Sequence, residues 1–252
     1  MVDLRRAGVM LISRIHAPEP AAASLRLAAV EADLADHGVP VRVLTTTPPP
    51  GQEINDPDGV CVSRWPALRD GEGQLRGYLP YMSFDIPLLL RVLTARSPGT
   101  YLVEPPPTTG AVMRVMASLL KRPYVWYAAD IWSDATEIAG APAPVVRVVR
   151  WLEQFALRGA SGVVAVSPGV AERARELGAR YVRVVPNGID TDLFHPGVSA
   201  PSAAEYAAAG VRHPYFVYAG TASEWQGADI FVTALRRLLD AGQFSESGQS
   251  GQ

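Results

Sequence analysis

The sequence has 252 residues, a formal net charge of −2, 48% hydrophobic residues and 19% charged residues. These values allow one or two domains with a sizeable buried core, and they exclude a largely disordered chain. The small net charge gives no electrostatic reason to expect a nucleic-acid partner. Lys121 is the only lysine among 23 basic residues, which rules out a phosphate-binding Gly-Lys-Ser/Thr loop.

Cysteine and histidine usage argues against a metal or a disulfide. Cys61 is the single cysteine, and the four histidines form no close-spaced pair. The longest uncharged stretch, Gly159–Ala171, has 13 residues, fewer than the roughly 20 that a transmembrane helix needs. Val9–Ile12 is too short for the apolar region of a signal peptide. We therefore expect a soluble, cytoplasmic protein without a bound metal.

Strand and helix patterns alternate along most of the chain. In order, they predict a strand at Val9–Ser13, a helix at Ala21–His37, strands at Val41–Thr45 and Val60–Ser63, a helix at Phe84–Ala95 with Pro87 in its first turn, a strand at Tyr101–Val103, a helix at Thr109–Leu120, a strand at Tyr124–Ala128, a helix at Val145–Arg158, a strand at Val163–Val166, a helix that Ser167 caps, and a strand at Val182–Val185. Such alternation requires crossover connections, so we predict an α/β fold with a doubly wound parallel sheet.

The predicted helix at Val145–Arg158 is the most clearly amphipathic. Its apolar residues, which include Val148 and Phe155, share one face that we expect to be buried. Its charged residues, among them Glu153, lie on the opposite face, which we expect to be exposed.

Ligands of open parallel sheets bind beyond the carboxyl ends of the strands, and two loops there carry candidate groups. His16 follows the first strand, where it could contact an acceptor or bond to the loop backbone. This loop lacks the three spaced glycines of dehydrogenase-type dinucleotide sites. Glu104 follows the strand at Tyr101–Val103, where it could bind sugar hydroxyls or satisfy backbone donors in a turn.

Three further strand ends carry candidates. Asp130 and Trp132 follow Tyr124–Ala128; the carboxylate could bond a sugar hydroxyl and the indole could stack on a sugar, or the pair could cap and pack. Ser167 fits a helix N-cap, and the helix start could also bind an anion. Asn187 belongs to an Asn-Gly turn that we interpret as mainly architectural, with a contact to ligand.

Ser161–Phe194 reads S-G-V-V-A-V-S-P-G-V-A-E-R-A-R-E-L-G-A-R-Y-V-R-V-V-P-N-G-I-D-T-D-L-F, and Tyr215–Gly220 reads Y-F-V-Y-A-G. Together these segments resemble the hinge region of retaining GT-B glycosyltransferases of the family-4-like group. The Asp-Ile-Trp sequence at Asp130 is similar to a motif of the same group. The resemblance implies an acceptor-side Rossmann-like domain at residues 1–195, a linker at 196–213 with a short helix, and the first β-α unit of a donor-binding domain at 214–242. Residues 243–252 are polar and patternless, which predicts a disordered tail.

The resemblance also implies a reaction. Members of this group transfer a sugar from a nucleotide-diphosphate donor to the hydroxyl of a carbohydrate or lipid-linked acceptor, with retention of configuration and usually without a metal. For this chain it implies Asp130 as a catalytic residue, and Gly220, Thr221 and Gln226 as donor-binding residues. The resemblance further implies a transferase of cell-envelope polysaccharide biosynthesis. Gln226 stands where the group usually has lysine, so we expect this chain to be inactive alone.

An alternative from another class is a non-catalytic sugar-binding or partner-binding module. Two further contacts are predicted from exposed apolar surface. Residues 214–240 would either fold back on the first domain or pair between chains, because a lone strand leaves its edge open. Thr109–Arg122 combines apolar and basic residues, so this helix either covers the sheet or touches the inner face of a membrane.

Overall fold

The computed structural model describes residues 7–71, 73–96, 98–188, 191–192, 194–211, 215–218 and 227–242. The chain divides into two compact units, Met1–Ile189 and Asp190–Gln252. The candidate site lies within the first unit.

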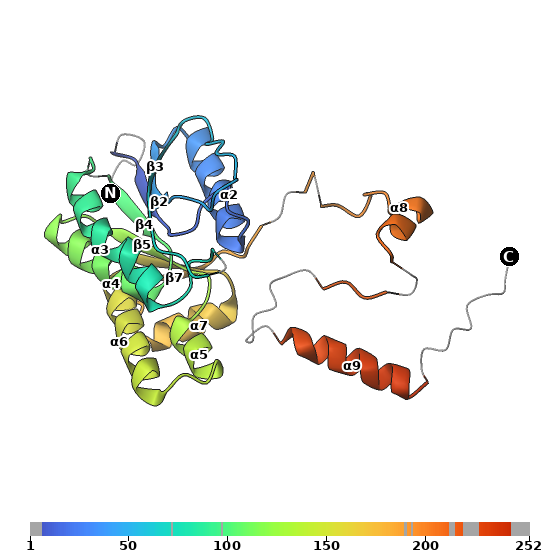
Figure 1. Ribbon diagram of the computed structural model, residues 1–252. Coiled ribbons are helices and arrows are strands. Elements are labelled where there is room, and N and C mark those ends of the chain that lie inside the picture. Colours follow the sequence, from blue (N-terminus) through green and yellow to red (C-terminus); the bar gives the residue numbers. More distant parts are fainter. Residues whose placement is uncertain are drawn as a thin grey trace. The chain divides into compact units, whose positions relative to one another are not determined.

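The first unit is built on a seven-stranded sheet in which all paired strands are parallel (Figure 1). The strands, in chain order, are β1 (Val9–Ile12), β2 (Val41–Thr46), β3 (Val60–Trp65), β4 (Thr100–Val103), β5 (Tyr124–Ala128), β6 (Gly162–Ala165) and β7 (Val182–Val184). Their order across the sheet is β3-β2-β1-β4-β5-β6-β7. The chain thus builds one half of the sheet outward from β1 and then returns to build the other half outward from β4.

Helices cover both faces of this sheet. Their bounds are α2 (Ala22–Asp36), α3 (Tyr78–Thr94), α4 (Pro107–Leu119), α5 (Trp132–Ile138), α6 (Ala143–Gly159) and α7 (Pro168–Glu176). Figure 1 shows α2 on one side of the sheet and α3, α4 and α6 on the other. The two faces have separate apolar clusters: Leu27 of α2 packs with Leu11 and Val43, whereas Leu88 of α3 and Met113 of α4 pack with residues such as Ile12.

The sequence predicted this architecture correctly. The α/β fold class and the doubly wound parallel sheet are confirmed, because every strand expected up to residue 185 is present. Two local predictions were wrong. Helix α3 begins at Tyr78, so Pro87 lies inside it rather than in its first turn. The short helix α5, at Trp132–Ile138, was not expected.

The buried face of α6 also differs from the prediction. Val148 and Trp151 of this helix are 57% and 62% exposed, whereas Glu153 is 1% exposed. Glu153 is buried because its carboxylate accepts hydrogen bonds from the backbone N–H groups of Trp132 (2.8 Å) and Ser133 (3.0 Å), the first two residues of α5. This carboxylate of α6 therefore caps α5, and α6 turns part of its own apolar stripe to solvent.

The second unit contains two helices among its described residues. Helix α8 (Ala203–Ala208), predicted as a short helix in the linker, begins with a capping box of Ser202 and Glu205. Helix α9 (Ala228–Asp240) is present as well. Tyr215–Tyr218, which the sequence predicts as a strand, have no regular secondary structure. A strand gains its backbone hydrogen bonds only from a neighbouring strand, and the described residues of this unit provide none.

We predict that Glu153→Ala lowers the free energy of unfolding by about 1–3 kcal/mol, because two backbone N–H groups at the start of α5 lose a charged acceptor. Glu153→Gln keeps one acceptor oxygen, and its loss should be smaller. The matched control is Glu172→Ala on the exposed side of α7, expected within about 0.5 kcal/mol of wild type. Urea denaturation of the four proteins tests this order, and equal midpoints for Glu153→Ala and the control would contradict the capping role.

Candidate functional site

The candidate site lies where the strand order reverses. β1 is hydrogen-bonded to β2 on one side and to β4 on the other. The loop after β1 leads to α2 on one face, and the loop after β4 leads to α4 on the other face. Diverging loops of this kind leave a crevice beyond the carboxyl ends of the strands, where α/β proteins bind their ligands.

Glu104 joins the two sides of this reversal point. Its side chain is buried, with one carboxylate oxygen 2.6 Å from the Ser13 hydroxyl and the other 3.1 Å from the Arg26 guanidinium of α2. Burial raises the pKa of Glu104, while the Ser13 hydrogen bond and the charges of Arg26 and Arg14 oppose that rise. Glu104 therefore fastens the β4 loop to the β1 loop and to α2.

Arg14, the second residue after β1, is the buried cation of the site. Only 6% of its surface is exposed, and its Nε and Nη1 atoms have no hydrogen-bond partner. Its guanidinium carbon lies 3.8 Å from the ring centre of Tyr81 on α3. Burial lowers the pKa of Arg14, and the nearby Tyr81, Asp85 and Glu104 oppose the shift. Buried donors without partners are rare in native proteins, which makes Arg14 a candidate ligand contact.

Asp85 is a buried acid on the same helix as Tyr81. Its Oδ1 accepts a hydrogen bond of 2.5 Å from the Thr109 hydroxyl, while its Oδ2 is buried without a partner. Burial raises the pKa of Asp85, and its hydrogen bonds and the charge of Arg14 oppose the rise. Arg14 and Asp85 thus bring unpartnered donors and an unpartnered acceptor to one place.

Trp132 completes this cluster with an aromatic wall. Its indole meets the Tyr81 ring edge to face, with the ring centres 6.0 Å apart and the planes at 77°. The Arg14 guanidinium carbon is also 6.0 Å from the Trp132 ring centre. Two rings beside an Arg–Asp pair suit a saccharide, whose hydroxyls both donate and accept and whose C–H face packs on aromatic surface.

His16 lies close by but is fully engaged. Its Nε2 is 2.9 and 3.1 Å from the two carboxylate oxygens of Glu31 on α2, and its Nδ1 is 3.0 Å from the carbonyl oxygen of Ala17. Both partners accept, so the contacts are satisfied together only when both ring nitrogens carry hydrogen. This histidine ties the β1 loop to α2, and the acceptor contact expected for it stays a prediction.

Asp130 and Asn187 are both exposed, just beyond β5 and β7 respectively. Ser167 is the N-cap of α7: its hydroxyl accepts a hydrogen bond of 3.2 Å from the Val170 N–H. This contact accounts for Ser167 without a ligand. The expected donor-binding residues Gly220, Thr221 and Gln226 lie outside the described residues.

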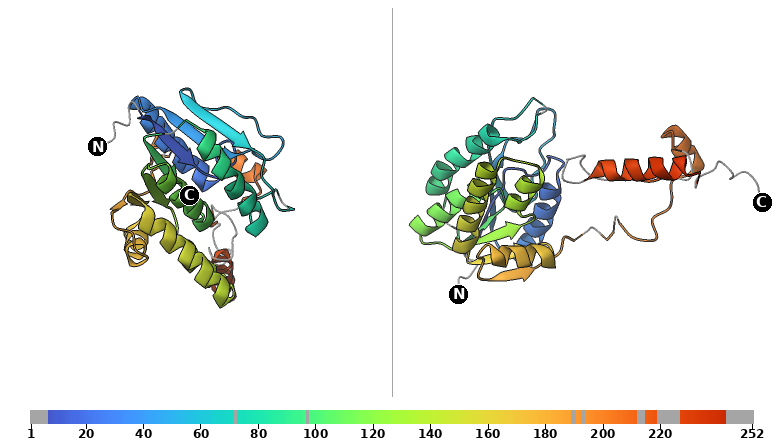
Figure 2. Two further views of the ribbon diagram at one scale, coloured as in Figure 1. Left: turned by 90° about the vertical axis from the view of Figure 1, so that its left-hand side faces the viewer. Right: turned by 90° about the horizontal axis from the view of Figure 1, so that it is seen from below.

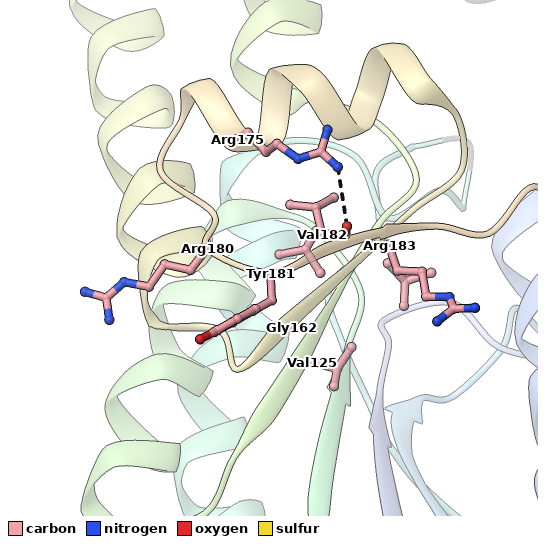
Figure 3. Close-up of a pocket in the computed structure, with 9 residues that line it drawn as sticks. Val125, Gly162, Arg175, Arg180, Tyr181, Val182 and Arg183 are labelled. Atoms are coloured by element: carbon pink, nitrogen blue, oxygen red, sulfur yellow. Dashed lines mark hydrogen bonds between the residues drawn. The ribbon is translucent and has the colours of Figure 1, made fainter.

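A separate hollow lies over the last strands of the sheet (Figure 3). Arg175, Arg180 and Arg183 surround it, and Arg175 donates to the carbonyl oxygen of Val182 at 3.4 Å. Gly162 and Tyr181, which also line it, stand at the starts of β6 and β7. The hollow therefore opens at the amino-terminal end of these strands, away from the reversal point, and its arginines are exposed.

Two kinds of feature are absent from the described residues. No three His, Cys, Asp or Glu side chains in that part of the chain gather into a possible metal site. None of the helices described combines the length and apolar character that a membrane crossing requires.

The parallel sheet, with its strand reversal between β1 and β4, defines a Rossmann-like domain, and its likeness to solved structures is to those of the GT-B type. A family model described as "Glycosyl transferase 4-like domain" matches residues 15–188. The chain therefore belongs to the glycosyl transferase 4-like family, and the resemblance noted from its sequence is confirmed. The match covers β2 to β7 and every residue of the cluster around Tyr81 and Asp85 except Arg14 itself. No curated protein sequence matches the chain.

Solved glycosyltransferase structures share the fold. Sucrose-phosphate synthase from Thermosynechococcus elongatus is 15% identical with a TM-score of 0.69, over 92% of this chain and 60% of that one. HepE from Anabaena in complex with UDP is 20% identical with a TM-score of 0.59, over 91% and 57%. The catalytic domain of starch synthase IV from Arabidopsis thaliana, bound to ADP and acarbose, is 15% identical with a TM-score of 0.53, over 97% and 60%. The chain thus spans about 60% of the length of each of these three solved chains.

Sequence reasoning missed part of this site. Tyr81 and Asp85 come from α3, which lies far from Arg14 in sequence, whereas site residues were expected in the loops that follow strands. A signal was present: Asp85 is the only acid in the mostly apolar helix Y-L-P-Y-M-S-F-D-I-P-L-L-L-R-V-L-T. An acid that a helix buries usually has a specific partner.

We predict that Asp85→Asn changes the pH dependence of stability. Because burial raises the pKa of Asp85, the folded protein holds this proton more tightly than the unfolded chain does. The contribution of Asp85 to the wild-type free energy of unfolding should therefore fall as pH rises from about 4, the pKa of an unperturbed Asp, to the pKa of Asp85 in the folded protein. The variant lacks the group, so its stability relative to wild type should rise across that window and then level off.

Urea midpoints measured at intervals from pH 4 to pH 7.5 give this difference. Asp36→Asn, at an exposed position at the end of α2, is the matched control and should run parallel to wild type. A parallel profile for Asp85→Asn would show that its carboxyl does not have the shifted pKa.

Proposed function

We propose that residues 7–188 form the acceptor-side domain of a retaining glycosyltransferase that uses a nucleotide-diphosphate sugar. The observation that carries this proposal is the cluster of Arg14, Tyr81, Asp85 and Trp132 at the strand reversal of a glycosyl transferase 4-like domain. The acceptor is a carbohydrate or a lipid-linked saccharide, and the pathway is cell-envelope polysaccharide synthesis in the cytoplasm.

Nucleotide-sugar binding is supported by the structural neighbours, since HepE was solved with UDP and with UDP-glucose. For this chain the donor contacts proposed are Gly220, Thr221 and Gln226, without a metal ion. Charge develops on the leaving diphosphate during transfer, so donor-side groups must supply positive charge or N–H dipoles there. We propose that the 252-residue chain, whose donor loop offers Gln226, does not catalyse transfer alone. Residues 214–240 would serve as a contact between chains.

Each acceptor-side residue has a proposed role. Asp130, exposed beyond β5, is the catalytic carboxylate and bonds the acceptor hydroxyl. Trp132 stacks on the sugar, while Arg14 and Asp85 bond its other hydroxyls. The unpartnered atoms of Arg14 are covered at present, with the Tyr81 ring 3.8 Å from the guanidinium. A bound saccharide would therefore displace the Tyr81 ring and take its place over Arg14.

The binding half of this proposal is testable on the chain itself. In saturation-transfer NMR against a panel of soluble oligosaccharides and lipid-acceptor head groups, the wild-type chain should bind at least one member. Trp132→Ala should weaken that binding about three- to tenfold, since an aromatic contact is worth about 0.5–1.5 kcal/mol. Trp151→Ala, which removes the exposed tryptophan of α6, is the matched control and should bind as wild type does.

The other outcomes discriminate between the alternatives. Transfer of labelled sugar by the isolated chain would overturn its proposed inactivity. Saccharide binding without any response to nucleotide sugars would favour a sugar-binding module. Equal binding by both tryptophan variants would remove Trp132 from the site.

A further inference from the structure

Strand β7 is the last strand of the sheet, and one of its edges is open. It pairs with β6 on one side, and within the described part of the chain no strand pairs with its other side. The Tyr181 carbonyl accepts a hydrogen bond from β6 and the Val185 N–H donates one to β6, each at 2.8 Å. Since successive residues of a strand turn their backbone groups to opposite sides, Val182 and Val184 turn theirs away from β6.

This edge is accessible. Tyr181, Val184 and Val185 each have more than a third of their surface exposed, and in both views of Figure 2 β7 and α7 (gold) lie at the margin of the first unit. Arg175 reaches the Val182 carbonyl at 3.4 Å, which is long for a hydrogen bond. The backbone of Val184 therefore offers a donor and an acceptor to a further strand.

Arginines surround this edge on both faces of the sheet. Helix α7, which carries Arg175, packs with Val182 in the apolar cluster on one face. Arg183, the next residue of the strand, points to the opposite face. Arg180 stands just before β7. Figure 3 shows the three guanidinium groups spread around the hollow rather than gathered at one point, which suits a chain of repeated negative charges better than a single anion.

The positive charge continues onto the neighbouring turn. Arg158, at the end of α6, packs over Gly178 in the turn between α7 and β7, where a Cβ would lie 2.7 Å from the Arg158 Cγ. Arg158, Arg180 and Arg183 are exposed, and they form no ion pair within the described part of the chain. An anionic partner can therefore pair with these arginines without breaking an existing ion pair.

Acids are scarce around this edge. From residue 154 to residue 189 the chain has five arginines and two acids. Of the acids, Glu176 is paired with Arg173 at 2.6 Å, and Glu172 lies one turn earlier in α7. This corner of the domain thus has an excess of positive charge, although the protein has a net charge of −2.

Helix dipoles account for only part of this charge. Arg158 and Arg175 stand in the last turns of α6 and α7, where a cation stabilises the helix. Arg180 and Arg183 come after α7 and have no such role.

We propose that the open edge of β7, with the arginines around it, binds an acidic, extended segment of a partner protein. The segment adds as a strand beside β7 and exchanges hydrogen bonds with the Val184 backbone. Its side chains alternate between the two faces, so its carboxylates meet Arg175 on one face and Arg183 on the other. The proposal does not depend on the sugar-binding site, which lies at the opposite end of the strands.

Other occupants fit this edge less well. A second copy of the same edge would bring arginines against arginines, and like charges on paired strands are destabilising. A nucleic acid supplies negative charge but has no peptide groups to pair with the Val184 backbone.

Fluorescence anisotropy with a labelled polyglutamate peptide tests the charge requirement on the 252-residue protein. The peptide should bind, its binding should weaken as salt is raised, and polylysine should not bind. Arg180→Gln and Arg183→Gln should each weaken binding about three- to fivefold. Arg147→Gln, which removes an exposed arginine near the start of α6, is the matched control and should bind as the wild type does.

A second pair of variants tests the backbone contact. Val184→Pro removes the outward N–H, and proline is tolerated on an edge strand at such a position, so pairing with β6 is kept. It should weaken polyglutamate binding about tenfold or more, whereas Val184→Ala, which retains the N–H, should stay within about twofold of wild type. Circular dichroism melting checks that each variant is folded.

Several results would overturn the proposal. These are no binding of polyglutamate by the wild type, equal binding of polylysine, or an equal loss in Arg147→Gln and Arg183→Gln. Equal binding by the folded Val184→Pro and Val184→Ala variants would show that the partner is not added as a strand. Tighter binding of a single-stranded oligonucleotide of the same charge would assign the edge to nucleic acid instead.

Discussion

The structure depends on one constraint: seven parallel strands whose order reverses after β3. A parallel sheet forces each strand to be followed by a crossover, and the reversal makes one crossover return from the edge of the sheet to its centre. Helix α3 is that return. Its Arg91 is buried and donates to the carbonyl oxygens of Thr45 and Ser63, at the ends of β2 and β3. The same helix thereby brings Tyr81 and Asp85 to Arg14.

At the reversal point the buried positive and negative charges are equal in number, but some of their polar atoms lack hydrogen-bond partners. Arg14 and Arg26 face Asp85 and Glu104, and burial shifts the pKa of Arg14 downward and those of both acids upward. Each shift shows that the charged form would be more stable in water. Glu104 is compensated by two hydrogen bonds, whereas Arg14 and Asp85 retain buried atoms without partners. Burying such atoms without partners lowers the stability of the fold. Unsatisfied groups of this kind are expected at ligand-binding sites.

Glu153 links the interior of the domain to its surface. By capping α5, it sets the position of Trp132 beside Tyr81. The same contact fixes how α6 is rotated about its axis, and that rotation exposes Val148 and Trp151. One buried carboxylate thus links the aromatic wall of the candidate site to the exposed apolar side of α6.

The sequence by itself determined the class of fold and the positions of its strands, because local apolar periodicity records which residues a parallel sheet must bury. It also singled out Glu104, Asp130 and Trp132 as candidate site residues, since each comes within a few residues of the end of a strand. Only the tertiary structure decided the partners of these residues. Helix α3 reaches the reversal point through a crossover, Glu153 meets α5 across 20 residues, and His16 turns to Glu31. Such contacts depend on how helices are rotated and packed, and the periodicity of a single helix does not contain that information.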